Sequence, residues 1–132
     1  MPQLQSIVLT DRATPTPVNR TFSPRDEVDG VGTTANTSVT PIGAERFSVS
    51  CKQSGSKFKS ELRLVVPVVQ TETINGVSRP VVVRTAYVTL LTSFDVASTE
   101  QERKDAIGML QSSLDPAKVL VNDALIKTEG VY

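Results

Sequence analysis

Apolar and polar residues alternate most clearly between residues 46 and 66, RFSVSCKQSGSKFKSELRLVV. Within each half of this stretch most apolar residues stand at every second position, and serine or charged residues fill most of the positions between them. Successive side chains of a β-strand point to opposite faces, so the pattern predicts two strands joined by a turn near Ser54-Gly55. The hairpin has one apolar face and one hydrophilic, mostly cationic face.

Turn-forming residues divide the rest of the first 95 residues into further strands. Residues 1–24 indicate an N-terminal hairpin with a Pro-rich turn, and a weak strand pattern follows at 31–38. A long β-branched strand covers 81–94. Before it, Asn75-Gly76 is a strong tight-turn signal, so residues 70–80 are expected to form the connecting loop.

The apolar period changes from two residues to 3.6 after Ser98. In STEQERKDAIGMLQSSL the apolar residues recur at helical spacing. Ser98 or Thr99 as N-cap, with Gln101 or Glu102 three residues later, fits a capping box. The segment is therefore predicted to be a helix.

A second helix is expected to follow, with Asp115 as N-cap, Pro116 at its first position and Gly130 at its end. Strands followed by two helices indicate an α+β fold. Its parts are an N-terminal β-hairpin, an antiparallel β-sheet meander and two C-terminal α-helices laid on one face of the sheet.

Two short helices are a thin cover for the apolar face of the predicted sheet. The apolar positions on that face are Phe47, Val49, Leu62, Leu64, Val66, Ala86, Val88, Leu90 and Phe94. An exposed apolar patch of this size is unusual for a monomer. We therefore expect an obligate homodimer in which a second chain supplies further helices.

Composition excludes several classes of function. Histidine is absent, which removes the usual general base and the commonest metal ligand. The single cysteine, Cys51, excludes an internal disulfide, and its parity predicts a packed apolar side chain. No signal pattern and no apolar run of ~20 residues is present, so no membrane partner is expected and synthesis in the cytosol fits. No metal or cofactor is expected.

The net charge of zero conceals an uneven distribution of charge along the chain. Residues 45–94 carry seven basic and three acidic side chains, whereas residues 95–132 carry four basic and seven acidic ones. The predicted sheet is therefore positive and the helical segment negative. This asymmetry suggests two surfaces with different roles, one of them facing an anion.

The polar parity of the strand at 81–94 reads Thr85, Tyr87, Thr89. In a meander Tyr87 shares a surface with the serines and cations of the hairpin. Such a mixture suits single-stranded RNA, because the ring stacks on a base, hydroxyls reach base edges or the 2′-OH, and cations hold phosphates. A solvated sheet face with a cross-strand Tyr–Thr pair accounts for the same pattern.

Taken in order, these stretches resemble the coat proteins of single-stranded RNA bacteriophages, the leviviruses. The resemblance rests on the hairpin RFSVSCKQSGSKFKSELRLVVP, the loop VVQTETINGVSRPVVVR, the strand TAYVTLLTSF, the helix start STEQER and the ending EGVY. It runs from LQSIVL near the start to Tyr132. No one piece decides the match, but their joint order and spacing are specific.

The resemblance implies one coat-protein domain over 1–132, with an N-terminal hairpin in 1–24, a five-stranded antiparallel sheet in 31–95 and two helices in 98–129. Two subunits would interlock, each one's helices crossing the partner's sheet, to give one continuous ten-stranded sheet. Such dimers would assemble into a T=3 icosahedral shell with the sheet facing packaged genomic RNA. The protein is then expected in the virion, and in the host cytoplasm before assembly.

Coat dimers of this family also bind an RNA hairpin at the start of the replicase gene and repress its translation. By position, the family's pocket for an unpaired adenine matches Ser48, Ser50, Glu61 and Arg63, with Val31 as an apolar wall. In the family this hairpin is a stem-loop operator. The resemblance therefore implies a second RNA partner besides the genome.

The remaining implied RNA contacts lie around this pocket. Tyr87 matches the tyrosine that stacks on a loop base, and Thr89 matches the polar residue beside it. The positions that contact the RNA backbone match Arg46, Lys52 and Lys59.

Two positions depart from the family's pattern. Glu61 stands where better-known members carry an uncharged hydrogen-bonding residue, and Thr89 replaces a residue with a longer polar side chain. A carboxylate accepts a base amino proton but repels phosphate. These departures bear on the operator sequence and not on RNA binding in general.

Two other functions fit parts of the sequence. One is a free-standing dimeric RNA-binding translational regulator that shares the RNA face but forms no shell. The other is a small hydrolase, which needs two carboxylates converging in a cleft. The carboxylates Asp95, Glu100, Glu102 and Asp105 instead fit a helix N-terminus, where they complement the helix dipole.

Overall fold

The computed structural model describes residues 2–36 and 41–132. Contacts between residues divide the chain into two compact units, Met1–Ser93 and Phe94–Tyr132. The first unit contains nearly all of the sheet, and the second contains both helices. Each unit is built from the elements that the sequence periodicity predicts for it.

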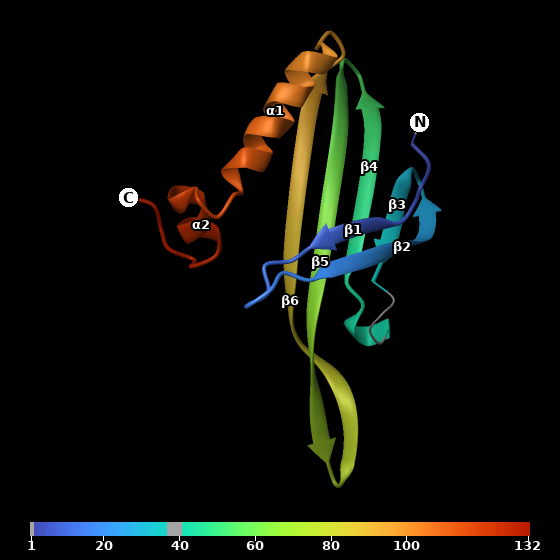
Figure 1. The fold of residues 1–132 in the computed structure, drawn as a ribbon. Helices are drawn as coiled ribbons and strands as arrows, with labels where there is room; N and C mark the ends of the chain where they lie inside the picture. Colours follow the sequence, from blue (N-terminus) through green and yellow to red (C-terminus); the bar gives the residue numbers. More distant parts are fainter. Residues whose placement is uncertain (1, 37–40) are drawn as a thin grey trace. The chain divides into compact units, whose positions relative to one another are not determined.

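Within the described residues, six strands form one sheet in chain order (Figure 1). They are β1 (Ile7–Thr10), β2 (Asn19–Val28), β3 (Val31–Ala35), β4 (Arg46–Ser54), β5 (Lys57–Ile74) and β6 (Val77–Asp95). The pairs from β1 to β5 are antiparallel, which confirms the predicted meander. A 3₁₀ turn, η1 (Pro41–Gly43), precedes β4.

Strand β2 changes partner along its length. Its first residues pair with β1, from Ile7 opposite Phe22, and its second half pairs with β3. The register shifts between Pro24 and Asp26, because proline has no backbone N–H to give to the ladder. The second half of β2 and the strands β3 to β6 therefore form the five-stranded sheet that the resemblance implied, although the strand runs beyond residue 24.

The turn at Asn75-Gly76 is confirmed, but the loop predicted over residues 70–80 is wrong. Strand β5 extends to Ile74 and β6 starts at Val77, so only two residues connect them. Both have positive φ, 51° and 79°, as a type I′ hairpin turn requires. A two-residue turn lets the β-branched residues on either side continue the strands. The strand predicted at 31–38 is β3, and residues 37–40 lie outside the described part.

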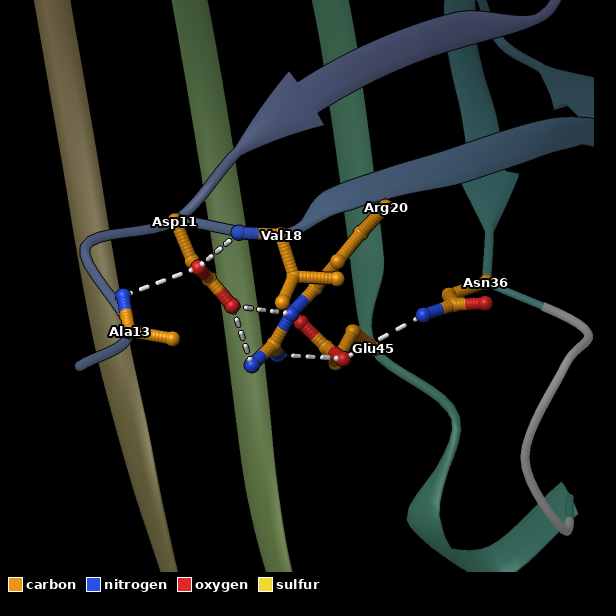
Figure 2. Close-up of polar contacts among 6 residues, drawn as sticks. All are labelled: Asp11, Ala13, Val18, Arg20, Asn36 and Glu45. Atoms are coloured by element: carbon orange, nitrogen blue, oxygen red, sulfur yellow. Dashed lines mark hydrogen bonds and ion pairs between the residues drawn. The ribbon is translucent and has the colours of Figure 1, made fainter. Parts of the chain in front are cut away.

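Ion pairs and hydrogen bonds of charged residues connect the N-terminal hairpin to the start of β4 (Figure 2). Asp11 accepts hydrogen bonds from the backbone N–H groups of Val18 (2.8 Å) and Ala13 (3.0 Å), and from Arg20 Nε (2.9 Å). Arg20 also forms an ion pair of 2.7 Å with Glu45, whose side chain is only 10% exposed. These contacts link the hairpin turn to β2 and to the residue that precedes β4.

Two residues of this network, Asp11 and Arg20, have displaced pKa values. The N–H groups of Val18 and Ala13, followed by Arg20, hold the pKa of Asp11 below its usual value. The hydrogen bond to Glu45 raises the pKa of Arg20. The ionised forms are therefore the ones that the folded hairpin stabilises.

Few apolar side chains are buried in the single chain. Among the described residues, the buried apolar ones are Phe22, Ala35 and Ala44, and Phe22 packs edge-on against Phe47 with ring centroids 6.4 Å apart. Val49, on the predicted apolar face, is exposed. Cys51, which lies opposite Ser60 near the turn of the β4–β5 hairpin, is also exposed, so the prediction that it packs in a core is wrong for the described residues of the single chain.

Helix α1 (Glu100–Ser113) begins as predicted. Thr99 is its N-cap, the Thr99 side chain accepts from the Glu102 N–H, and the Glu102 carboxylate accepts from the Thr99 N–H. This is the capping box that the sequence indicated. Four large apolar side chains of the helix and its C-cap remain at least one-third exposed: Ile107, Met109, Leu110 and Leu114.

Helix α2 (Val119–Leu125) begins later than predicted. Asp115 uses its side chain to accept from the Ala117 N–H and its carbonyl to accept from the Lys118 N–H, which closes a turn before the helix starts. Lys118 is the N-cap, so the assignment of Asp115-Pro116 to the helix start is wrong. The helix also ends before Gly130, and the positive φ after it belongs to Thr128.

Candidate nucleic-acid interface

The registers of β3, β4 and β5 bring the predicted hydrophilic residues onto one face. Ser50 lies opposite both Val31 and Glu61, which places these three side chains in one row across the sheet. Directly opposed residues of antiparallel strands point to the same side. The row of Ser48 and Arg63 therefore lies on the same face, because both are two residues away along their strands.

Seven of the nine predicted site residues lie together in this way. We call this surface the polar face; its residues are Arg46, Ser48, Ser50, Lys52, Lys59, Glu61 and Arg63. Four of the seven are cations and one is a carboxylate, so the polar face has a net charge of +3. The apolar parity of the same strands occupies the opposite side.

Exposure divides the polar face into a centre and a periphery. Ser48, Ser50 and Glu61 are half-buried in the middle, beside half-buried Val31. The four cations are exposed around them. The face thus offers hydroxyl and carboxylate groups in a partly desolvated centre, where hydrogen bonds discriminate best, and charges at the edge, where phosphates remain hydrated.

An ion pair joins two residues of the polar face. Arg63 Nη2 donates to Glu61 Oε1 at 2.5 Å, and the two side chains are 58% and 32% exposed. The residues are two apart on β5, so both point to the same side of the strand. At the other end of the face Lys52 lies opposite Lys59, and two adjacent like charges favour an anion between them.

Sequence reasoning missed Thr33 as a member of the polar face. It lies opposite Ser48 on β3 and is half-buried, so its hydroxyl belongs to the centre. The alternation of Val31, Thr33 and Ala35 was the available signal, but it was too short to fix the register of the strand.

Tyr87 and Thr89 lie on β6, the strand next to β5 in the sheet. Both are exposed, and the Tyr87 side chain is among the most exposed large ones in the sheet, at 74%. Besides being neighbours in the sheet, β5 and β6 are linked by side chains: the hydroxyl oxygens of Thr73 and Ser78 are 3.0 Å apart, and the Thr92 hydroxyl donates to the Ser60 carbonyl at 3.5 Å.

The described residues contain no group of three or more His, Cys, Asp or Glu side chains placed to hold a metal ion. Of the two helices in this part of the chain, neither has the length and apolar character needed to cross a membrane.

Comparisons with known proteins agree with this architecture. The family model described as levivirus coat protein matches residues 2–132. The capsid protein of Pseudomonas phage PRR1 is 47% identical over 131 residues, which are 98% of this chain and 99% of that protein.

Solved structures share the fold over nearly the whole chain. A virus-like particle of bacteriophage NT-214 has a TM-score of 0.84 at 22% identity, and covers 99% of this chain and 100% of its own. A structure described as an unassembled virus coat protein dimer and a bacteriophage RNA-binding dimer has a TM-score of 0.61 at 20% identity, with 98% of each chain covered. The match to the family model and the identity to a phage capsid protein together show that this chain belongs to the levivirus coat protein family, and is a capsid protein rather than an enzyme.

Proposed function

We propose that two copies of this chain form an interlocked homodimer with one continuous ten-stranded sheet, and that such dimers build a T=3 icosahedral shell around single-stranded genomic RNA. A dimer also binds an RNA stem-loop and represses replicase translation. The protein is located in the virion, and in the host cytoplasm before assembly. The chain acts as one coat-protein domain over residues 1–132.

The exposed apolar side chains support the dimer. On the sheet, Val49 is 44% and Val88 57% exposed, and the helices leave Met109 and Leu120 about two-thirds exposed. A chain with this much uncovered apolar surface gains free energy when a second copy covers it. The related structures described as a virus-like particle and as a dimer are consistent with such assembly.

The single observation that best supports RNA binding is the register of β4 against β5. It places the serines, the Glu61–Arg63 pair and the Lys52–Lys59 pair on one side of a sheet whose other side is apolar. Cations can hold phosphates while hydroxyl and carboxylate groups read bases, which is how proteins bind single-stranded RNA and RNA loops. In the dimer, two polar faces would lie side by side.

We place Thr89 beside this face because of one contact between β5 and β6. The Thr92 hydroxyl reaches the Ser60 carbonyl. A ladder with residue 92 opposite residue 60 has Thr89 opposite Arg63, because antiparallel partners change by one in opposite directions. Thr89 then extends the row of Ser48 and Arg63 onto β6.

In the same ladder Tyr87 would lie opposite Val65, which supports a position on the side of the polar face. Near the turn, however, Thr73 meets Ser78, which corresponds to a register one residue different. We therefore expect a β-bulge between these two points. Pro67 lies within this part of β5, and proline inside a sheet is found at bulges because it cannot donate to the ladder.

Electron microscopy of the purified protein tests the shell. Uniform particles that contain nuclease-protected RNA are expected, because the polar face is cationic and the dimer is self-complementary. A protein that sediments only as a small RNA-binding species would instead be a free-standing regulator without a shell. A protein that remains monomeric would contradict the dimer as well.

Two substitutions test the RNA face on unassembled dimers. Tyr87→Ala should weaken stem-loop binding by roughly 1–3 kcal/mol, the value of one base–aromatic stack. Lys59→Ala should weaken binding to all RNAs about equally and lower the salt-dependence slope by about 0.7–0.9, because one phosphate contact is lost. Lys104→Ala, which removes the same charge from α1, is the matched control and should leave the slope unchanged.

If Tyr87→Ala binds the stem-loop as tightly as the parent and Lys59→Ala keeps the parental salt slope, RNA binds elsewhere on the protein. Circular dichroism of both variants should match the parent, because both side chains are exposed and contribute little to the core.

A further inference from the structure

Two turns of the sheet have the same backbone shape but different surroundings. Asp29-Gly30 joins β2 to β3 and Asn75-Gly76 joins β5 to β6, and all four residues have φ between 51° and 79°. The Gly30 N–H donates to Glu27 Oε1 at 2.8 Å. Among the described residues, neither the Gly76 N–H nor the Asn75 side chain has a hydrogen-bond partner. The second turn therefore leaves a backbone nitrogen and an amide side chain next to each other and open to water.

The space around the two glycines differs in the same way. A Cβ atom added to Gly30 would lie 3.5 Å from Lys52 Cε, whereas one added to Gly76 would meet nothing within 4 Å. Strand β4 pairs with β5 only as far as Val65, and all residues from 71 to 80 are exposed. The end of the β5–β6 hairpin thus extends beyond β4 as a two-stranded ribbon (Figure 1). Such a ribbon is only marginally stable in water, so its turn opens more readily than the rest of the sheet.

An open Asn-Gly turn allows a reaction of the chain with itself. The Gly76 nitrogen attacks the side-chain carbonyl carbon of Asn75, because glycine has no Cβ that hinders the approach. The new C–N bond closes a succinimide ring. The C–N bond of the side-chain amide breaks, and its nitrogen leaves as ammonia together with the proton from the Gly76 nitrogen.

Water then opens the succinimide ring at one of its two carbonyl groups. Addition at the former side-chain carbonyl returns the main chain to its original path and gives aspartate. Addition at the main-chain carbonyl gives isoaspartate, in which Gly76 stays attached to the former side-chain carbon. In both cases one ring C–N bond breaks, the Gly76 nitrogen regains a proton, and a neutral amide has become a carboxylate.

We propose that Asn75 is a site of spontaneous modification, at which subunits that remain unassembled convert to isoaspartate or aspartate and thereby lose the ability to enter a shell. The Asp29-Gly30 turn does not share this reactivity, because its nitrogen is held by Glu27 and a carboxylate is a poorer electrophile than an amide. The remaining asparagines each precede a residue with a side chain; they are Asn19, Asn36 and Asn122.

Isoaspartate changes the shape of the hairpin as well as its charge. The main chain gains one methylene group at residue 75, which a two-residue type I′ turn does not accommodate. The pair of Thr73 and Ser78, whose hydroxyl oxygens are 3.0 Å apart, then loses its register. Both products also place a carboxylate between Ile74 and Val77, which are apolar and 48% and 66% exposed.

The effect on assembly rests on the proposed shell, whereas the reaction itself does not. Ile74 and Val77 at the tip are suited to contact a neighbouring dimer, because apolar side chains gain free energy when they are covered. A displaced and charged tip no longer offers this contact. The reaction therefore excludes from assembly those subunits that have waited longest.

Peptide mapping of the soluble, unassembled protein tests the site. Trypsin releases Asn75 in the peptide 64–84, because Arg79 precedes a proline and is not cleaved. After incubation at mildly alkaline pH, chromatography with mass spectrometry separates the asparagine, aspartate and isoaspartate forms, and an isoaspartyl methyltransferase with a labelled methyl donor counts isoaspartate. The modified forms of this peptide should increase with time, while the peptides that contain Asn19 and Asn122 remain unchanged.

Asn75→Gly is the matched control. It removes the reacting amide, and Gly-Gly also fits a type I′ turn, so the hairpin is kept. This variant should accept no methyl label above the level of freshly purified protein. An unmodified 64–84 peptide in the parent would overturn the site, as would equal modification at the other asparagines or equal labelling of Asn75→Gly.

Assembly of an aged sample measures the consequence. Modified 64–84 peptide should be severalfold rarer in the particles than in the unassembled fraction, and aged Asn75→Gly should assemble as well as fresh protein. Equal proportions of modified peptide in both fractions would refute the effect on assembly and leave the shell intact. If fresh parent forms no particles, the proposed shell and this effect both fail, and the peptide map alone decides whether Asn75 is modified.

Discussion

Replacing Arg20 by methionine removes the cation that links the N-terminal hairpin to the start of β4. The replacement keeps most of the apolar part of the Arg20 side chain. Asp11 retains the backbone donors of its turn, but Glu45, 10% exposed, loses its ion pair and keeps the hydrogen bond from the Asn36 amide, at 3.3 Å. Breaking a fully buried pair costs about 3–5 kcal/mol, and breaking an exposed pair about 0–1 kcal/mol. The Arg20 side chain is 38% exposed, so an intermediate loss of about 2 kcal/mol is expected.

Urea denaturation of unassembled dimers at neutral pH, followed by circular dichroism, measures this loss. Adding Glu45→Gln to the Arg20→Met variant should recover much of the stability, because the unpaired charge is then gone. Lys104→Met, which breaks the exposed pair with Glu100 on α1, is the control and should cost no more than about 0.5 kcal/mol. The reasoning is refuted if Arg20→Met is as stable as the parent, or if the double variant is no better than the single one.

Phe22→Ala should lower the free energy of unfolding by about 3–5 kcal/mol in the same assay, because Phe22 is 1% exposed and packs on a second ring; a loss below about 1 kcal/mol would contradict its place in the core. Thr99→Ala should cost about 1 kcal/mol and reduce helicity, since it removes the N-cap of α1; Ser112→Ala, near the other end, should have a much smaller effect. Because the pKa of Asp11 is lowered in the folded state, its contribution to the free energy of unfolding is fully present above pH 3.8 and is lost as the pH falls through the folded pKa. Asp11→Asn should therefore make stability depend less on pH in this acid range. An unchanged dependence of stability on acid pH would contradict the network. Deleting residues 72–73 and 78–79 keeps the Asn75-Gly76 turn but shortens both strands, and should leave folded dimers that fail to close shells in sedimentation; normal particles would refute a role for this hairpin between dimers.

The sequence predicted those parts of the structure that depend on neighbouring residues. Alternation located β4 and β5, and Asn75-Gly76 identified a turn whose positive φ angles few other residue pairs accept. The capping box of α1 is also local, since Thr99 and Glu102 are one turn apart. Because the turn of β4 and β5 fixes their register, most of the polar face was predictable too.

Features that depend on distant residues could not be predicted. Arg20 and Glu45 are 25 positions apart, and only the folded hairpin shows that the two side chains meet. Cys51 is exposed although it stands at an apolar position of β4, because burial depends on which other elements pack over a strand. The alternation within one strand does not show that packing. Asp115 carried a valid N-cap signal, but Asp side chains also stabilise turns, and here the turn formed.

The scarcity of buried apolar side chains in the single chain has a kinetic and thermodynamic consequence. If the proposed dimer supplies the missing cover, folding and association are one reaction, and its equilibrium includes the protein concentration. The midpoint of thermal unfolding should then rise with concentration, and refolding should contain a second-order phase that slows on dilution. A newly made chain would therefore become a stable capsid subunit only after it has met a second copy, so the number of chains in the cell sets when shell material becomes available.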